Sequence, residues 1–309
     1  MESRLVVQRV LPSGRQALVR PFHLSLEGLK SSTVCRDEED YDVMVKSVFL
    51  CARRHDVIVV IYAVVSNHAH IAVLSEELGQ VERFANNLKQ VHSMWLSRKY
   101  GGVSTLLGTC AYITAIETVQ YARNVFAYIP RNALDNGAEN IATYKWSAYR
   151  AMFCKPGADE NGGSLRPVKN FSRRCIRQCF HTGDKLTNVP WMLNGNMELE
   201  PASACDCAYL ESVFNNDQSF FMRLVGSANM PEMTYDLSIV KNERLNDASF
   251  IKLANEYAGS WYRTNIYEMS PAMKARFLAY LSRKLHLRVP QVARCLEMDR
   301  EIVAKILGK

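Results

Sequence analysis

The pattern of apolar and polar positions divides the first half of the chain into segments with strand spacing and segments with helical spacing. Four segments have the alternation or β-branched character of strands: 16–26, 57–65, 68–74 and the short 111–113. Three segments repeat apolar residues at helical spacing: 37–54, 81–100 and 117–129. Ser66 and Asn67 form a two-residue turn between the second and third strands. This order predicts an α+β domain in which helices pack on an antiparallel sheet.

The end of the chain has its own helical pattern. Ser270 before Pro271 predicts a capped helix that runs to about residue 286, and a short helix follows at 290–296. Asp299 then caps a last helix that ends at Leu307. Several apolar positions fall where a helix-turn-helix buries its side chains: Val292, Ala293, Leu296, Met298, Val303, Ile306 and Leu307. A generic three-helix packing unit is the alternative.

Between these two regions, the stretch 155–167 is rich in glycine, proline and polar residues, which is typical of a domain boundary. The segment after it shows weak periodicity. We therefore predict three parts: an α+β domain at 1–155, a connector at 156–250 whose structure the pattern does not define, and a mainly helical module at 251–309 that ends in a helix-turn-helix-like segment.

The composition excludes several classes of protein. With 48% hydrophobic and 22% charged residues in 309, the chain is neither wholly disordered nor a collagen-like or coiled-coil rod. The longest apolar run, 57–65, is far shorter than the roughly 20 residues of a membrane helix, and the first residues have no signal-peptide stretch. We expect a soluble cytoplasmic protein without a membrane partner.

Positive charge is concentrated at the end of the chain. Of a formal net charge of +7, an excess of six arises from residues 263–309, where ten Lys and Arg face four Asp and Glu. Together with the helix-turn-helix pattern, this excess favours DNA binding by Arg294, Arg300 and Lys305 over a merely solvated helix surface. An earlier basic stretch contains Arg173 and Arg174, which either contact phosphates or belong to an exposed helix face.

The nine cysteines are scattered and odd in number, and we interpret them as reduced thiols. Two close pairs, Cys175/Cys179 and Cys205/Cys207, lie near His181 and raise the question of a zinc site. Their spacings do not match the usual zinc-binding patterns, so small buried hydrophobic residues are the favoured interpretation.

His68 and His70 are the histidines with a clear chemical pattern. On a strand, residues i and i+2 point to the same face, so the two imidazoles project together and form two thirds of a metal site. By itself this spacing is weak evidence. The other five histidines have no such neighbour in the sequence, and we assign them structural or surface roles: His23, His55, His92, His181 and His286.

Further motifs accompany this pair in a definite order. Phe22-His23-Leu24 and Glu39-Asp40-Tyr41 precede the hairpin that contains Asn67-His68-Ala69-His70, and Tyr128-Ile129-Pro130-Arg131-Asn132 and Tyr144-Lys145-Trp146-Ser147-Ala148-Tyr149 follow it. Together, over about residues 16–153, they resemble the HUH single-tyrosine transposases, in particular the branch of REP-associated tyrosine transposases. The helix-turn-helix-like end fits some members of that branch.

The resemblance implies a ferredoxin-like HUH nuclease domain that cleaves and rejoins single-stranded, hairpin-containing DNA. It implies that Tyr128 is the nucleophile, which forms a phosphotyrosine intermediate, and that His68, His70 and Asn132 hold Mg²⁺ or Mn²⁺. Tyr128 and Asn132 share one face of an intact helix, although Pro130 between them removes a helix hydrogen bond. DNA is thus the expected partner, and a homodimer is a further expected assembly.

The chain also departs from the family pattern. The stretch 102–112 lacks the Trp, Gln and Arg that the family usually has there, Glu27 stands where arginine is common, and Ala133 replaces a proline. These departures keep a second hypothesis open, a catalytically degenerate DNA-binding protein that descends from such a transposase. A replication or mobilisation nuclease, and a metal hydrolase without a nucleic-acid role, fit the pattern less well.

Overall fold

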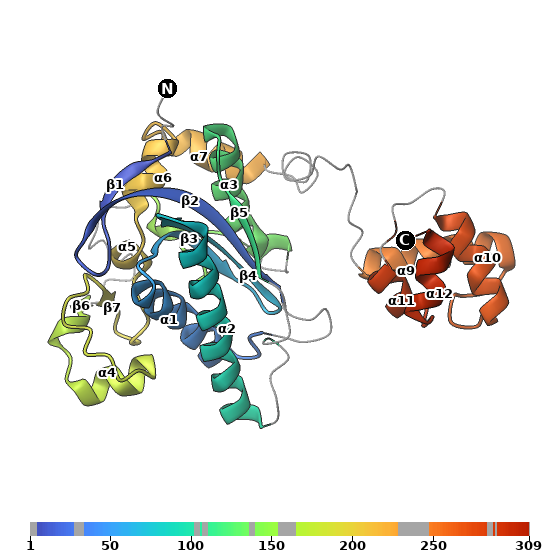
Figure 1. Ribbon diagram of the computed structural model, residues 1–309, viewed down its shortest axis with the longest axis horizontal. Helices are drawn as coiled ribbons and strands as arrows, with labels where there is room; N and C mark the ends of the chain where they lie inside the picture. Colours follow the sequence, from blue (N-terminus) through green and yellow to red (C-terminus); the bar gives the residue numbers. More distant parts are fainter. Residues whose placement is uncertain are drawn as a thin grey trace. The chain divides into compact units, whose positions relative to one another are not determined.

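The computed structural model describes residues 5–27, 34–101, 106, 111–135, 140–153, 165–227, 247–282, 287 and 289–308. By its internal contacts the chain divides into a first unit, Met1–Met233, and a second unit, Thr234–Lys309 (Figure 1). This differs from the predicted division at 155 and 250, because apolar residues between 165 and 227 belong to the core of the first unit. Most of the predicted boundary, residues 154–164, lies outside the described residues.

An antiparallel sheet forms the centre of the first unit. Its strands are β1 (Val7–Val10), β2 (Gln16–Glu27), β3 (Ile58–Val64), β4 (His68–Ser75) and β5 (Ala111–Ala115). The pairing gives the order β5–β2–β4–β3, and β1 pairs with the first residues of β2. The expected α+β class with an antiparallel sheet is confirmed; β1 is an addition that the pattern did not predict.

Alternation along β2 separates two faces of the sheet. Phe22, Leu24 and Leu26 point to one face, and His23 and Ser25 point to the other. Helices α1 (Glu38–Arg54) and α2 (Leu78–Tyr100) pack on the first face, where the rings of Phe49 and Tyr62 meet edge to face at 5.6 Å. Figure 1 shows both helices on the same side of the sheet.

Helix α3 (Val119–Asp135) packs on the opposite face, against β3 and β4. It was predicted to end at residue 129, but it continues through Pro130. The buried residues Ile129 and Ala133 pack on both sides of the proline, and this burial offsets the lost hydrogen bond. Arg131 also donates to the carbonyl oxygens of Val225 and Gly226, at 3.2 and 3.1 Å, which ties the end of the helix to α7.

The residues after α3 cover the outer edge of β3. Ser147 forms a bridge with Ala63, and the amide of Asp206 donates to the carbonyl of Val59 at 2.8 Å. Of the elements in this region, α6 contacts β3, α7 packs on α3 and α4 packs on α1. The elements are η2 (Tyr149–Ala151), β6 (Arg166–Pro167), η3 (Val168–Asn170), α4 (Arg173–Phe180), β7 (Met192–Leu193), α5 (Pro201–Ala204), α6 (Cys207–Val213) and α7 (Gln218–Ser227).

The second unit is helical in its described part. It contains α9 (Asp247–Tyr262), α10 (Pro271–Leu281), α11 (Val289–Cys295) and α12 (Arg300–Leu307). Ser270 and Asp299 cap α10 and α12 as predicted. The predicted apolar residues of this end are buried or half-buried in one core, and residues 283–286, 288 and 309 lie outside the described part. None of the described helices in either unit has the length and apolar character needed to cross a membrane.

Candidate active site

The hairpin between β3 and β4 sets the position of the two predicted histidines. The amide of Val65 donates to the carbonyl of His68 at 2.9 Å, which closes the turn. The carbonyl of Ser66 accepts hydrogen bonds from the amides of Val34 and Cys35, at 2.6 and 3.0 Å, so the segment before α1 holds the turn from outside. The rings of His68 and His70 lie 5.0 Å apart, with His70 buried and His68 half-buried.

Helix α3 brings the other two predicted residues to this pair. The Oδ1 atom of Asn132 lies 3.0 Å from Nε2 of His68, and the ring of Tyr128 meets that of His70 edge to face at 5.2 Å. The Nδ2 atom of Asn132 donates to the carbonyl of Tyr128 at 3.3 Å, which orients its Oδ1 atom towards His68. Side chains about sixty residues apart in sequence thus form one cluster, as the motifs predicted.

Both ring nitrogens of His68 face an amide oxygen. Nδ1 lies 2.8 Å from Oδ1 of Asn67, and Nε2 lies 3.0 Å from Oδ1 of Asn132. A neutral imidazole has one N–H, so it can donate to only one of these oxygens. If Nδ1 donates to Asn67, then Nε2 and the Asn132 oxygen present lone pairs to each other. A cation between them would satisfy both atoms.

A third histidine completes the cluster, although the sequence analysis gave it only a structural or surface role. Nε2 of His23 lies 3.1 Å from Nδ1 of His70, and the two rings stack at 5.2 Å. Burial lowers the pKa of His23 to about 4, and burial with the neighbouring His23 and His68 lowers the pKa of His70 well below its usual value. Both imidazoles are therefore neutral near pH 7, the form that can bind a metal ion. We call His23, His68, His70, Tyr128 and Asn132 the histidine cluster.

The sheet register places two further side chains on the same face. Ser25 lies opposite His70 on one side and opposite Tyr112 on the other. The Oγ atom of Ser25 is buried and has no hydrogen-bond partner in the described part of the chain. Tyr112 is 58% exposed, so an aromatic ring faces solvent in the same row of the sheet as the site.

The donor set of this cluster fits a divalent cation. It offers two imidazoles, one amide oxygen and a nearby hydroxyl without a partner. The 3.0 Å between Nε2 of His68 and Oδ1 of Asn132 also matches two adjacent ligands, each about 2.1 Å from a common ion in octahedral geometry. Across the described residues no three His, Cys, Asp or Glu side chains converge as a metal site, and this includes the described cysteines near His181. Oxygens of substrate or water would complete the coordination.

The predicted DNA-binding residues lie on the surface of their own units. Arg173 and Arg174 are exposed on α4, whose apolar side is buried in the core of the first unit. In the second unit Arg294 is exposed on α11, and Arg300 and Lys305 are exposed on α12.

Tyr144 and Tyr149, on either side of Trp146, are partly buried and pack against the core of the first unit. The hydroxyl of Tyr144 donates to the carbonyl of Val64 at 2.6 Å, and the ring of Tyr149 packs on that of Phe221 at 5.8 Å. Tyr128, the third tyrosine of these motifs, has a ring contact with His70.

Comparisons with protein-family models, curated proteins and solved structures gave no match for this chain. The resemblance to HUH single-tyrosine transposases is therefore one of sequence motifs.

Proposed function

We propose that the first unit is a metal-dependent DNA strand transferase of the HUH single-tyrosine type. The observation that supports this most is the convergence of His68, His70, Tyr128 and Asn132, which come from two separate motifs, onto one face of the sheet. A core histidine pair would need neither an asparagine oriented towards it nor a half-exposed tyrosine against it. The proposed substrate is single-stranded DNA with a hairpin.

The strand order supports the finer assignment of the fold. Without β1, the sheet has the order β5–β2–β4–β3, with helices after β2 and after β4. This order supports a split β-α-β arrangement of the ferredoxin-like type, in which the first and third strands are central. The histidine pair lies on the third of these four strands, and the tyrosine lies on the helix that follows the fourth.

The chemistry assigned to each side chain follows from its type and position. Tyr128 attacks the scissile phosphorus through its phenolic oxygen, so that one P–O bond forms and the bond to the departing sugar oxygen breaks. The phenolic proton ends on that sugar oxygen, which leaves as a hydroxyl. The reverse attack by a sugar hydroxyl rejoins the strand. His68, His70 and Asn132 would hold Mg²⁺ or Mn²⁺, which when bound supplies positive charge to the phosphate.

A single-stranded substrate also fits the surface beside the cluster. Tyr112 lies two strands from His70 in the same row and is 58% exposed, so an unpaired base can stack on its ring. In a duplex this face of the base is covered by its neighbours. Replacing Tyr112 with alanine should therefore weaken binding of single strands more than binding of duplex DNA, which competition in a fluorescence-anisotropy titration measures.

The experiment that tests the proposal is a strand-cleavage assay. Labelled single-stranded hairpin DNA is incubated with the full chain and Mn²⁺, and covalent adducts are separated on a denaturing gel. We expect a shifted band with the native chain and with Tyr121→Phe, a change one heptad earlier on the same helix, and none with Tyr128→Phe. An adduct that persists in Tyr128→Phe overturns the assignment of the nucleophile.

For the second unit we propose DNA binding through α11 and α12. The exposed Arg294, Arg300 and Lys305 project from a helix pair whose apolar residues form the core. Each phosphate contact contributes about 0.9 to the slope of log affinity against log salt. The double variant Arg300→Ala/Lys305→Ala should lower that slope by about two if both residues contact phosphates; an unchanged slope means that these helices only pack.

The same residues support a second function, a DNA-binding protein that has lost catalysis. The departures in 102–112 favour it, and most of that stretch lies outside the described residues. In that case the cleavage assay gives no adduct with the native chain, while DNA binding by the second unit persists.

A further inference from the structure

His23 is the member of the histidine cluster for which the proposed reaction has no role. It lies on β2, the strand next to the histidine pair, and is 6% exposed. Its Nε2 atom contacts Nδ1 of His70 at 3.1 Å. The sheet register pairs His23 with Ala72, so the ring reaches His70 diagonally across two backbone-paired strands. Both histidines lie on paired strands, so the sheet, and not a loop, sets the contact between their rings.

We propose that His23 is a positioning residue that holds His70 in the tautomer whose Nε2 atom has a free lone pair. This inference depends on the proposed function, because it assigns Nε2 of His70 as a ligand of the divalent ion. Only one hydrogen can lie between the two nitrogens. If His70 donates from Nδ1, its Nε2 atom can bind the ion; if His23 donates, the hydrogen of His70 is on Nε2 and blocks binding.

The neighbouring histidine supports the first arrangement. Nδ1 of His68 faces the Oδ1 atom of Asn67 at 2.8 Å, and a hydrogen on Nδ1 that donates to this oxygen leaves Nε2 to the site. His23 lies at the corresponding position beside Nδ1 of His70, and its Nε2 lone pair is the acceptor. Each histidine of the pair thus has its own partner at Nδ1, one from the turn and one from the adjacent strand. Such partners set the tautomer and ring orientation of metal-binding histidines.

Ring packing has to be separated from the hydrogen bond, because the stacked ring of His23 also fills space beside His70. His23→Phe keeps an aromatic ring and removes the acceptor. His23→Gln restores an acceptor on a side chain of similar reach. Val73→Ala is the matched control, since Val73 is fully buried on β4 but faces away from the cluster, so it lowers stability without contacting His70.

The first readout is the tautomer of His70 in the metal-free protein, from long-range ¹⁵N–¹H correlation spectra of the full chain. We expect the Nδ1–H form in the native chain, in His23→Gln and in Val73→Ala, and a shift towards the Nε2–H form in His23→Phe. An Nε2–H tautomer in the native chain overturns the proposal, and so does an unchanged tautomer in His23→Phe.

The second readout is the dissociation constant for Mn²⁺ alone, measured by calorimetry. We expect binding to weaken at least tenfold in His23→Phe, to recover within about threefold in His23→Gln, and to stay unchanged in Val73→Ala. Equal affinity in His23→Phe and the native chain contradicts the proposal. If the native chain binds no Mn²⁺, the proposed function fails, and the tautomer of His70 still decides whether His23 positions that ring.

Discussion

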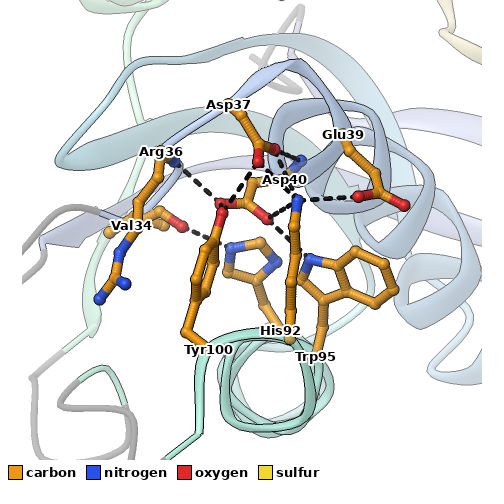
Figure 2. A network of polar contacts seen from close by, with 9 residues as sticks. Val34, Arg36, Asp37, Glu39, Asp40, His92, Trp95 and Tyr100 are labelled. Carbon is orange, nitrogen blue, oxygen red and sulfur yellow. Dashed lines mark hydrogen bonds and ion pairs between the residues drawn. The ribbon is translucent and has the colours of Figure 1, made fainter.

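Two clusters of buried polar side chains in the first unit differ in how their polar atoms are hydrogen-bonded. The first, between the start of α1 and the end of α2, surrounds a fully buried carboxylate (Figure 2). Asp40 accepts hydrogen bonds from the amide of Arg36, Nε1 of Trp95, Nζ of Lys99 and the hydroxyl of Tyr100, at 2.9, 2.9, 3.0 and 2.8 Å. We call Asp37, Asp40, Trp95, Lys99 and Tyr100 the carboxylate cluster. Its central charge is fully paired within the protein.

The histidine cluster is arranged differently. Both nitrogens of His68 face amide oxygens, and the Oγ atom of Ser25 is buried without a partner in the described part of the chain. A buried polar atom without a partner costs stability. The comparison teaches that the fold pairs the charge of Asp40 with several donors, whereas the hydroxyl of Ser25 has no partner among the described residues.

The pKa values of Asp37 and Asp40 reflect the hydrogen bonds that their carboxylates accept. The hydrogen bond from Lys99, together with one from the amide of Asp40, lowers the pKa of Asp37 to about 2. Burial raises the pKa of Asp40, but its hydrogen bonds from Trp95, Arg36, Tyr100 and Lys99 outweigh burial and leave the pKa below its usual value. Both groups are ionised in the folded protein at neutral pH.

The largest effect is expected from breaking the carboxylate cluster. Asp40→Asn leaves the donors of Arg36, Trp95 and Tyr100 without the buried carboxylate that accepts their hydrogen bonds and should lower the free energy of unfolding by about 3 kcal/mol. Lys99 keeps its ion pairs with Asp37 and Glu39. Urea unfolding followed by circular dichroism measures this change. Mn²⁺ affinity at a temperature where the variant is folded should stay as in the native chain. A variant that is as stable as the native chain would show that the network is not structural.

A change in the histidine cluster should instead weaken metal binding with little effect on stability. His68→Ala removes one proposed ligand and should weaken Mn²⁺ binding about a hundredfold, the upper range for a metal-site change. His68 is half-buried and its ring is not part of the apolar core, so unfolding should change by less than about 1 kcal/mol. His55→Ala, a change at the end of α1, is the control. Unchanged Mn²⁺ binding in His68→Ala contradicts the metal assignment.

Most elements of the first unit could be predicted because hydrophobic period and caps are local signals. Asp37 caps α1, Gly101 ends α2 with a positive φ of 73°, and the strands around Ser66-Asn67 lie within a residue of their predicted ends. The prediction that α3 ends at residue 129, just before Pro130, was wrong. The helix continues because its residues are buried against the sheet, and the sequence of the helix alone does not show that burial. The residues between 165 and 227 form short elements whose packing partners are distant in sequence, so periodicity gave no signal there.

The candidate site was predictable where a motif marked it. His68, His70, Tyr128 and Asn132 follow motif spacings, and the structure brings them together. His23 was missed because its partner lies on another strand, and one sequence does not give the register that pairs Ser25 with His70. The sequence did contain one signal, the alternation of side chains along a strand. His23 lies between the apolar residues Phe22 and Leu24, so its side chain points to the opposite face of the sheet.

Acid should weaken the carboxylate cluster in a defined pH window. Because Asp37 and Asp40 have lowered pKa values, the folded state binds fewer protons than the unfolded state below about pH 4. Stability is therefore complete above that pH and is lost as the pH falls towards 2. Asp37 is half-exposed, so the loss from it is about 1 kcal/mol after solvent screening. In Lys99→Met, urea unfolding from pH 6 to pH 2 should show a smaller loss; equal slopes would contradict this origin.

The smallest expected effect concerns a path of hydrogen bonds from α2 to the turn that holds the histidine pair. Nε2 of His92 donates to the carbonyl of Val34 at 2.7 Å, and the amide of Val34 donates to the carbonyl of Ser66 at 2.6 Å. Ser66 directly precedes Asn67 and His68, so this path of two hydrogen bonds connects α2 with the turn that holds the histidine pair. The path holds only one end of the hairpin, while β2 and β3 hold β4 along its length. Loss of the first bond should therefore loosen the turn rather than displace it.

His92→Leu removes that donor and should lower the free energy of unfolding by about 1 kcal/mol and weaken Mn²⁺ binding about threefold. Ala85→Gly is the matched control, because Ala85 is buried on the same helix and the change costs about 1 kcal/mol without altering a hydrogen bond to Val34. Calorimetric titration of both variants separates the two possibilities. If the two variants bind Mn²⁺ equally well, this path of hydrogen bonds does not position the histidine pair.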